Sequence, residues 1–371
     1  MGGTEQNFVQ EAFEENWIAP LGPNVNGFES DIQDFTGVSH AAALSSGTSA
    51  IHLALDILGV GPKDLVLVQS FTFCASVNPI KYLGGEPVFI DSESETWNMC
   101  PKALQKALSF FKSDGSLDRV KAILPVHLYG MPAKMDEICA IAAEYGIPIV
   151  EDAAESIGST LIGKHTGTFG DFGIYSFNGN KIITTSSGGA LVSSSREKIE
   201  LGRKLATQGR DDAPHYQHSM IGYNYRMSNV CAGIGRGQME VLNDRISQRR
   251  ENYIRYQEIF ESINDSGYSI AFQEESPKAY SNRWLTAIYM DPERNKGKTR
   301  EELRLYLEEL NIEARPLWKP MHLQPVYEGA LYFGASVCEE LFEHGLCLPS
   351  GSNLSKEDWI RIEDGLTEFF I

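Results

Sequence analysis

The sequence lacks any apolar run long enough to cross a membrane, since no stretch approaches about 18 uncharged apolar residues. Basic residues are also few: 32 Lys and Arg stand against 50 Asp and Glu, which gives a formal charge of −18. A surface this acidic repels nucleic acid and anionic membranes, so we expect neither as a partner. A small anionic ligand is still compatible with this charge, because a few backbone N–H groups or one Arg can bind an anion at short range despite the negative potential of the whole surface.

Paired cysteine spacings and targeting signals are missing as well. The six cysteines show no CxxC spacing and mostly lie among apolar residues, which favours buried thiols over disulfides or a metal site. The first 17 residues contain neither a basic segment nor an apolar run, so we expect no signal peptide. The cytoplasm follows as the default compartment. No metal site is predicted.

From about residue 40 to 195 the sequence alternates helical and strand patterns at short spacing. The helical patterns cover Thr48–Leu58 and Lys134–Tyr145. The strand patterns are short apolar runs at Leu65–Val68, Pro87–Asp91, Val120–Val126 and Ile147–Glu151. This alternation predicts an α/β domain with a largely parallel sheet. Polar residues at the C-terminal ends of such strands tend to line the ligand crevice.

The C-terminal third has a different pattern. A long helical stretch is predicted from Val230 to Phe260, and we interpret its basic run, Arg245–Arg250, as a solvated helix face. A strand at Asn282–Met290 and an amphipathic helix at Thr299–Leu310 follow. We therefore expect a smaller α+β domain, with a large domain over 1–245 and a small one over 246–371.

Two short segments next to these elements could carry chemistry. Ser45–Thr48 precedes a helix, where small residues allow backbone N–H groups to approach an anion and the Thr48 hydroxyl can add a hydrogen bond. A plain N-cap by Ser or Thr is the alternative. Phe73 lies at or beyond the end of the strand Leu65–Val68, where it could stack on a flat heteroaromatic ring or belong to the core.

Asp152 comes directly after the predicted strand Ile147–Glu151. A carboxylate at the end of a buried strand is costly unless it is paired or hydrogen-bonded. Beside a pyridine nitrogen, Asp152 would keep that nitrogen protonated and make the ring a better electron sink. A metal-binding carboxylate and a helix N-terminal acid are the competing interpretations, and no His or Asp cluster accompanies it to favour metal.

Lys181 lies in a polar, glycine-containing stretch between two apolar segments. A desolvated lysine amine is a nucleophile that can form an imine. Ser176, five residues earlier, could supply a second hydroxyl to a phosphate. Taken singly, Lys181 also fits an exposed loop lysine, as most lysines are.

The combination is more specific than its parts. Pyridoxal 5′-phosphate (PLP) requires four features in its binding site. These are backbone N–H groups for its phosphate, an aromatic side chain stacked on its ring, an acid beside its ring nitrogen, and a lysine that forms an imine. A Rossmann dehydrogenase fits poorly, because SSGTSA stands where a GxGxxG would open the first helix.

These segments resemble the DegT/DnrJ/EryC1/StrS family of sugar aminotransferases, from about residue 14 to the C-terminus. The motifs that carry the resemblance are SSGTSAIHLAL, SFTFCAS, PVHLYG, EDAAESIGS, GTFGDFG, SFNGNKIITTSSGGA and GYNYRMSN. The resemblance implies a fold-type-I PLP-dependent transferase, with a large domain whose mixed sheet is mostly parallel and flanked by helices, and a smaller α+β C-terminal domain.

The resemblance also implies roles for individual residues. Lys181 matches the lysine that carries PLP as a Schiff base, Asp152 the partner of the pyridine nitrogen, and Phe73 the residue stacked on the ring. The phosphate-side positions are matched by Gly47, Thr48 and Ser176. Asn224, in GYNYRM, matches a residue that reaches the phosphate from the neighbouring subunit, which implies a homodimer with shared active sites.

Five further stretches are NWIAPLGPNVNGFE, EDAAES, NGNKIITTS, SNRWLT and ARPLWKPMHLQPVY. In these the chain looks most like the family members that make UDP-4-amino-4,6-dideoxy-N-acetylglucosamine, the bacillosamine precursor. That likeness places two segments near the nucleotide sugar. The first consists of Asn16, Trp17, Ile18 and Ala19, and the second contributes Arg315, Trp318, Lys319 and His322. Gly47 and Ser176 are also expected to contact the sugar substrate. Many family members have Gln where this chain has Glu155. Glu at this position fits the bacillosamine-type subgroup, and we expect Glu155 to be one of the cofactor-binding residues. The chain is also expected to lack a short segment that relatives carry before Met1.

The function implied is transfer of an amino group from L-glutamate to the C4 ketone of UDP-2-acetamido-4-keto-2,4,6-trideoxy-hexose, with Lys181 as the single base. Three alternatives stay open. The substrate could be a GDP- or dTDP-linked keto sugar, or the chain could be a non-catalytic regulator on the same fold. A dehydratase of the same family is disfavoured, because it would carry His in place of Lys181.

Overall fold

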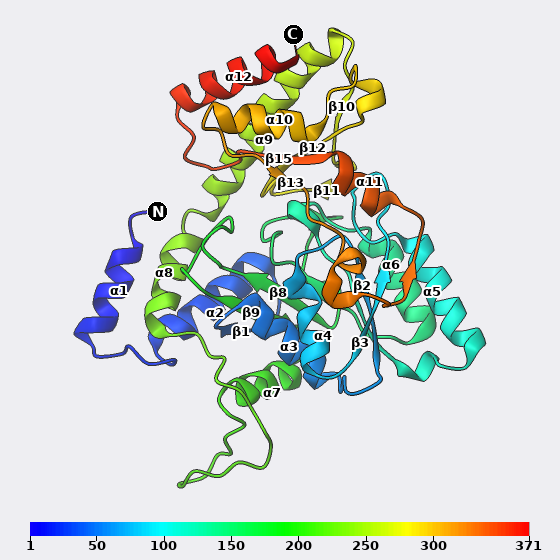
Figure 1. Cartoon of the computed structure of the whole chain (residues 1–371). Helices are drawn as coiled ribbons and strands as arrows, with labels where there is room; N and C mark the ends of the chain where they lie inside the picture. Colours follow the sequence, from blue (N-terminus) through cyan, green and yellow to red (C-terminus); the bar gives the residue numbers. More distant parts are fainter. Residues whose placement is uncertain (371) are drawn as a thin grey trace.

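The computed structural model describes residues 1–370, and its larger part is built on a mostly parallel sheet (Figure 1). Its strands are β1 (His40–Leu44), β2 (Leu65–Gln69), β3 (Glu86–Ile90), β4 (Val120–Leu124), β5 (Val150–Asp152), β8 (Phe172–Ser176), β9 (Gly189–Ser193) and β14 (Tyr332–Phe333). One half has the order β1-β9-β8-β5 and the other β14-β3-β2-β4. Parallel bridges next to β4 and β5 join the halves. Within the halves only β9 runs antiparallel to its neighbours, which confirms the predicted mixed, mostly parallel sheet.

Helices cover both faces of this sheet. The helices of this part are α1 (Glu5–Glu14), α2 (Pro23–Thr36), α3 (Gly47–Ile57), α4 (Asn78–Tyr82), α5 (Pro101–Asp114), α6 (Met135–Tyr145), α7 (Arg196–Ala206) and α8 (Asn229–Met239), with 3-10 turns η1 (Cys74–Ser76), η2 (Leu117–Arg119) and η3 (Leu128–Gly130). Val66 and Val68 of β2 pack in the cluster that contains α3, whereas Leu65 and Leu67 pack against α5 and α6. Successive side chains of a strand point to opposite faces, so the continuous apolar run of β2 is explained by burial on both sides.

The predicted elements of this part are present with small shifts at their ends. The helix expected from Thr48 begins at Gly47, and the strand expected at Ile147–Glu151 covers Val150–Asp152. The C-terminal ends of β2, β5 and β8 lie at one edge of the sheet, as parallel pairing requires. This edge faces the C-terminal part of the chain.

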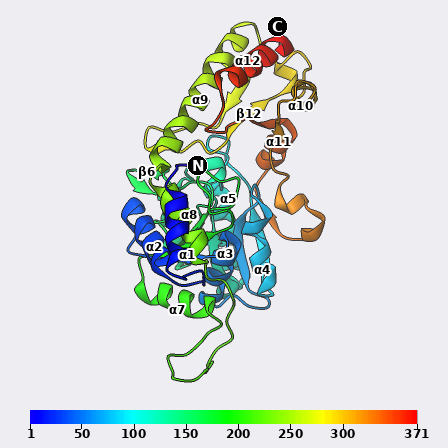
Figure 2. The same ribbon diagram turned by 90° about the vertical axis from the view of Figure 1, so that its left-hand side faces the viewer.

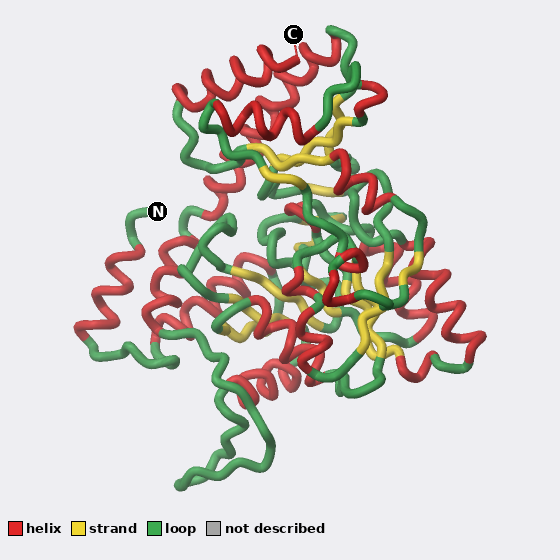
Figure 3. Tube along the Cα trace, viewed as in Figure 1, coloured by secondary structure: helices red, strands yellow, loops and turns green. Residues whose placement is uncertain are grey.

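A second, antiparallel sheet of order β10-β12-β15-β13 forms the C-terminal part, and Figure 3 shows it as a separate group of strands. Its strands are β10 (Ile270–Phe272), β12 (Thr286–Met290), β13 (Arg315–Pro316) and β15 (Gly345–Leu348). The helices are α9 (Leu242–Asp265), α10 (Arg300–Glu309), α11 (Val337–His344) and α12 (Lys356–Phe370), with 3-10 turns η4 (Pro292–Arg294), η5 (Met321–Leu323) and η6 (Pro325–Tyr327). One apolar cluster joins α9, α10 and α12 to this sheet. Thr299 caps α10 in a capping box with Glu302, as the sequence predicts for the cap residue.

The expected single helix from Val230 to Phe260 is wrong in one respect, because α8 ends at Met239 and α9 begins at Leu242. The solvated interpretation of the basic run is wrong for two of its members. Arg249 Nη1 donates to the Trp284 carbonyl at 2.7 Å, and burial lowers the pKa of Arg249 to about 10. Arg250 pairs with Glu275 at 2.7 Å. The helical periodicity of the sequence could not show that this face of α9 packs against the segments that carry Glu275 and Trp284.

The division at residue 245 stays a prediction. That position falls inside α9, which continues without interruption. β14 lies in the C-terminal third of the chain and pairs with β3 at the edge of the large sheet. A small sheet of order β11-β6-β7 also mixes both parts of the chain, with β6 (Thr160–Leu161), β7 (Lys164–His165) and β11 (Ala279–Tyr280).

The segment from 207 to 226 forms an arm that reaches away from the body beyond α7 in both views (Figures 1 and 2). The C-terminal end of this arm lies back against the body, where the Tyr225 carbonyl accepts the N–H of Ser45 at 2.8 Å. None of the helices described in residues 1–370 is long and apolar enough to span a membrane.

Candidate active site

A cavity of about 830 Å³ opens where the C-terminal ends of the central strands face the C-terminal sheet. Most of the residues singled out from the sequence line it: Gly47, Thr48, Phe73, Asp152, Glu155, Ser176, Lys181, Arg315 and Trp318. Cys347, in β15, and Ser350, just after it, also line the cavity. The cavity therefore lies between two sheets that are distant in sequence.

One wall is the N-terminus of α3. Ser46 is the N-cap, and its hydroxyl accepts the N–H of Ser49 at 3.0 Å. The first N–H groups of a helix have no partner within it, so those of Gly47 and Thr48 are available to an anion at the positive end of the helix dipole. The capping and anion-binding interpretations of this segment are thus compatible, since the cap uses Ser46 and the cavity is lined by Gly47 and Thr48.

Two glycines allow the backbone to close tightly around this wall. A Cβ on Gly189, at the start of β9, would lie 2.3 Å from the carbonyl carbon of Ser46. A Cβ on Gly47 would lie 3.2 Å from Cβ of Ser176. The backbones of α3, β8 and β9 therefore approach one another closely beside the N-terminus of α3.

Asp152 ends β5 and is almost fully buried. Its Oδ2 accepts the Ser76 hydroxyl at 2.6 Å, and its Oδ1 accepts the Ala154 N–H at 3.1 Å. Because Ser76 donates its only hydroxyl hydrogen to Asp152, Thr72 donates to Ser76 across their 2.6 Å contact. These bonds hold the carboxylate in place and orient it at the cavity.

The two competing interpretations of Asp152 find no support. Within residues 1–370 there is no group of three or more His, Cys, Asp or Glu side chains that could hold a metal ion. Turns rather than a helix follow β5, so Asp152 is not a helix N-terminal acid.

Lys181 and Glu155 form a buried ion pair in the cavity. Lys181 Nζ lies 3.2 Å from Glu155 Oε1, and the two side chains are only 12% and 4% exposed. Oε2 of Glu155 accepts the N–H of Tyr129 at 2.8 Å. Burial raises the pKa of Glu155 to about 7, against the attraction of the Lys181 charge. The interpretation of Lys181 as an exposed loop lysine is therefore wrong.

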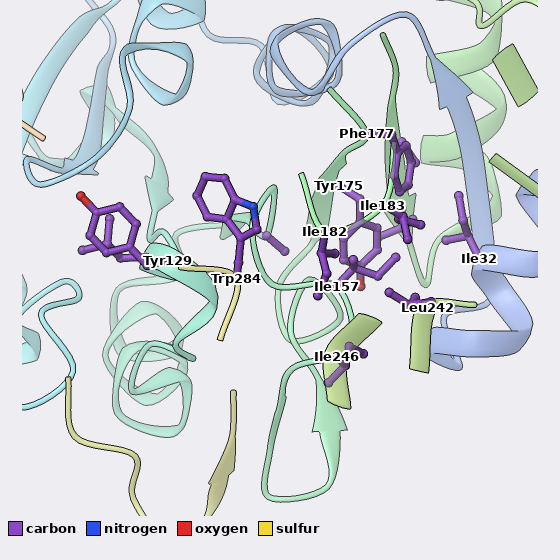
Figure 4. Close-up of a cluster of buried hydrophobic side chains, with 14 of the residues drawn as sticks. Ile32, Tyr129, Ile157, Tyr175, Phe177, Ile182, Ile183, Leu242, Ile246 and Trp284 are labelled. Carbon is purple, nitrogen blue, oxygen red and sulfur yellow. The ribbon is translucent and has the colours of Figure 1, made fainter. Parts of the chain in front are cut away.

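The residues that follow Lys181 hold it in place. Ile182 and Ile183 lie in the same buried cluster as Leu242 and Ile246 of α9 (Figure 4). On the cavity side, the Lys181 Nζ lies 4.2 Å from the centre of the Trp284 ring, a cation–π distance. With isoleucines anchored in the core and the amine between a carboxylate and an aromatic face, the lysine is restricted to the cavity.

The exposed aromatic residue of this site is Phe73, of which 53% is accessible. Its ring centre lies 5.6 Å from that of Trp318, and the Trp318 N–H donates to the Tyr129 hydroxyl at 3.1 Å. Phe73 is thus a cavity side chain and not a core aromatic. Arg315, at the mouth, donates through Nε to Glu313 at 2.7 Å.

Several predicted substrate-binding residues, and the predicted phosphate-binding residue Asn224, do not line the cavity of this chain. Asn16, Trp17, Ile18 and Ala19 are exposed between α1 and α2, and Lys319 is exposed beyond β13. Asn224 is exposed at the base of the arm. His322 is partly buried: its Nδ1 lies 2.7 Å from the Ser70 hydroxyl and its ring stacks on Tyr332.

Three site residues were not singled out from the sequence. They are Ser76, which binds Asp152, Tyr129, whose backbone binds Glu155, and Trp284, which faces Lys181. Ser76 and Tyr129 lie in the motifs SFTFCAS and PVHLYG, and Trp284 lies in the strand predicted at Asn282–Met290. The motifs were a usable signal for the segments, but which side chain in each faces the cavity depends on local geometry.

The chain belongs to the DegT/DnrJ/EryC1/StrS aminotransferase family, whose model matches residues 1–367. It is 50% identical to EpsN of Bacillus subtilis, whose name describes it as a pyridoxal phosphate-dependent aminotransferase, over 100% of this chain and 94% of that protein. It is 37% identical to GDP-perosamine synthase of Escherichia coli O157:H7, over 99% of this chain and 96% of that protein. A solved aminotransferase of the same family from Brucella abortus superposes with a TM-score of 0.90 at 29% identity, over 99% and 95% of the two chains.

The expected family, fold type and class of enzyme are confirmed: the chain is a PLP-dependent sugar aminotransferase. The residues of the cavity fit the cofactor. A buried amine suits its aldehyde, a buried and hydrogen-bonded carboxylate suits its ring nitrogen, and a helix N-terminus closed by glycines suits its phosphate.

Proposed function

We propose that this chain transfers the amino group of L-glutamate to the C4 ketone of UDP-2-acetamido-4-keto-2,4,6-trideoxy-hexose, which gives UDP-4-amino-4,6-dideoxy-N-acetylglucosamine. The observation that carries the aminotransferase part is the buried Lys181 amine, 3.2 Å from Glu155 in a cavity that Asp152 also lines. The choice of sugar and of the UDP moiety rests on the resemblance of the motifs described above. The cytoplasmic location stays a prediction.

In this proposal each cavity residue has a defined task. PLP, when bound, supplies an aldehyde that condenses with amines and a ring that delocalises negative charge. Asp152 would hold the ring nitrogen, Phe73 would pack on the ring, and Gly47, Thr48 and Ser176 would hold the phosphate; all five line the cavity. Glu155 lies beside Lys181 at the same end of the site.

Lys181 is the base in both halves of the reaction. Its Nζ takes the α-proton of glutamate in the first half and delivers a proton to C4 of the sugar in the second. Because Nζ is held between Glu155 and Trp284, its position changes little between the two halves. One lysine is then sufficient for both proton transfers.

We propose that the site is completed in a homodimer. Gly47, Ser176, Arg315 and Trp318 line the cavity from one chain, whereas Asn224 and the Asn16–Ala19 segment do not. The arm that carries Asn224 also exposes Tyr216 and Ile221 at 81% and 88%. Exposed aromatic and aliphatic side chains on a projecting arm support burial against a second copy. Asn224 then reaches the phosphate of the neighbouring site, and Asn16–Ala19, Lys319 and His322 lie near the nucleotide sugar.

A GDP-linked keto sugar is the second candidate substrate. Three GDP-perosamine synthases are 33% to 37% identical to this chain over nearly its whole length. Both candidates would present a ketone at C4, so they are distinguished by the nucleotide and by the substituent at C2.

The experiment follows the cofactor by its visible absorption. The purified protein is expected to show a PLP band that glutamate removes and the UDP-linked keto sugar restores. UDP-, GDP- and dTDP-linked keto sugars are compared at equal concentration, and the UDP substrate is expected to restore the band fastest. Faster restoration by a GDP sugar would replace the first candidate by the second.

The Lys181→Ala variant is expected to lose the band and the activity. Lys278→Ala is the matched control, because Lys278 is an exposed lysine paired with Asp136. Full transamination by Lys181→Ala would overturn the assignment.

A further inference from the structure

Lys181 faces a conflict of charge in its own site. Its amine reacts as a nucleophile or base only when neutral. Yet the amine lies 3.2 Å from the Glu155 carboxylate, and the two groups form an ion pair in the cofactor-free site. With both side chains almost buried, the Glu155 carboxylate is the nearest group in the site that can take this proton.

We propose that Glu155 takes the proton that Lys181 must lose before its amine can react, and returns it afterwards. The inference rests on the proposed function, because it presupposes that Lys181 is the reacting amine. In the step, one N–H bond of Nζ breaks and its electron pair stays on nitrogen, while an O–H bond forms at Oε1. The ammonium–carboxylate pair becomes a neutral amine and a neutral carboxylic acid, so the net charge of the buried site does not change.

The surroundings of Glu155 suit both protonation states. Its Oε2 accepts the Tyr129 N–H whether or not Oε1 carries a proton, so the side chain stays oriented. The negative charge of Asp152 adds to burial in raising the pKa of Glu155, and the positive charge of Lys181 lowers it. The resulting value of about 7 places both states within reach at neutral pH.

The other groups around the pair do not compete for the proton. Burial raises the pKa of the Cys347 thiol to about 12 and that of the Tyr129 hydroxyl well above its ordinary value, so both stay neutral. Trp284 attracts the ammonium form through its ring face but accepts no proton. Asp152 is engaged by the Ser76 hydroxyl and the Ala154 N–H. Glu155 is therefore the acceptor in contact with Nζ.

A glutamine at position 155 would preserve the shape and remove this capacity, because an amide neither holds the charge nor takes the proton. Glu155→Gln is thus the informative variant. In the full chain freed of cofactor, competitive acetylation by acetic anhydride, read at Lys181 by mass spectrometry, reports the pH at which the amine becomes neutral. We expect the midpoint to fall by about one to three pH units in Glu155→Gln, since an opposite charge at this distance is lost.

The cofactor-loaded protein gives a second measurement. The pH at which the visible band changes is expected to fall in the same direction, because the carboxylate no longer stabilises positive charge on Nζ. Glu155→Asp is expected to rescue part of both shifts, because it retains the carboxylate. If Glu155→Gln fails to fold, Glu155→Asp alone is expected to show a smaller shift of the same sign.

Glu313→Gln is the matched control. It removes a carboxylate from the same cavity, but from a residue paired with Arg315 and not with Lys181. Its midpoints are expected to equal those of the wild type. A folded Glu155→Gln protein with unchanged midpoints, or a Glu155→Asp protein without any shift where only that variant folds, would overturn the inference. A protein in which Lys181 forms no band with PLP would instead contradict the proposed function.

Discussion

The Asn282 amide nitrogen donates to the backbone carbonyl of Glu155 at 2.9 Å. The same nitrogen donates to the Ile157 carbonyl, also at 2.9 Å, and its Oδ1 accepts the Trp284 N–H at 3.0 Å. One buried side chain thereby fixes the turn that carries Glu155 and the segment that brings Trp284 over Lys181. Asn282 therefore holds both neighbours of the lysine amine, the Trp284 ring and the Glu155 carboxylate.

Asn282→Ala is expected to weaken both the fold and the site. Buried carbonyl and N–H groups left without partners cost about 1–3 kcal/mol each, so we expect a loss of about 3 kcal/mol in the free energy of unfolding. Urea unfolding of the cofactor-free protein measures it. Asn243→Ala, at an exposed position of α9, is the control and is expected to change stability by less than about 0.5 kcal/mol. Equal stability of the two variants would contradict the role of Asn282.

Gly189→Ala is expected to weaken cofactor binding. The new Cβ would lie 2.3 Å from the Ser46 carbonyl carbon and 2.4 Å from the Gly47 nitrogen, so the backbone next to the helix N-terminus must shift. Overpacking of this kind costs about 1–3 kcal/mol, and if the cost falls on the cofactor site it lowers the affinity for PLP by roughly 5- to 150-fold.

The control for Gly189→Ala is Gly179→Ala. Gly179 lies two residues before Lys181, and its added Cβ would have only the Ser186 carbonyl oxygen at 4.0 Å. Equilibrium dialysis of PLP against both variants distinguishes them. Unchanged binding by Gly189→Ala would show that the narrow approach of β9 to α3 is not required.

Much of the candidate site could be predicted from the sequence, because parallel strands place their C-terminal ends at one edge. Asp152 and Lys181 are 29 positions apart, yet both line one cavity since β5 and β8 are neighbours. The family motifs then predicted which polar residues at that edge bind the cofactor. The class of enzyme and the cofactor followed from those residues.

The supports of the site could not be predicted in this way. The bond between Ser76 and Asp152 depends on how the turn η1 is oriented, and the contact of Trp284 with Lys181 depends on how two sheets face each other. The break between α8 and α9 was missed because the helical pattern continues through Glu240 and Val241. Local patterns describe elements, whereas these contacts arise only when distant elements meet.

Glu151→Gln is expected to destabilise the sheet beside Asp152. The Glu151 carboxylate is fully buried and accepts the N–H groups of Gly167 and Gly170, at 2.9 and 2.6 Å, as well as His127 Nε2 at 3.0 Å. His127 Nδ1 accepts the Ala133 N–H, so its Nε2 carries the hydrogen given to Glu151. An amide group would point two hydrogens at donors, and we expect a loss of about 3 kcal/mol in stability. Thermal unfolding compared with the exposed control Glu137→Gln measures it, and equal Tm values would refute the prediction.

Glu155 is also expected to make the stability of the cofactor-free protein depend on pH. Its pKa of about 7 in the fold exceeds the ordinary value of 4.5, so the folded protein binds the proton more tightly than the unfolded chain. The stabilisation is therefore complete below about pH 4.5 and is lost as the pH rises to about 7. Glu155→Gln cannot ionise, so its unfolding free energy is expected to fall less than that of the wild type between these values. Urea unfolding at several pH values measures both slopes, with Glu137→Gln expected to retain the wild-type slope. If Glu155→Gln instead showed the wild-type slope, the pKa of Glu155 would not be raised in the fold, and the carboxylate would be ionised throughout the neutral range.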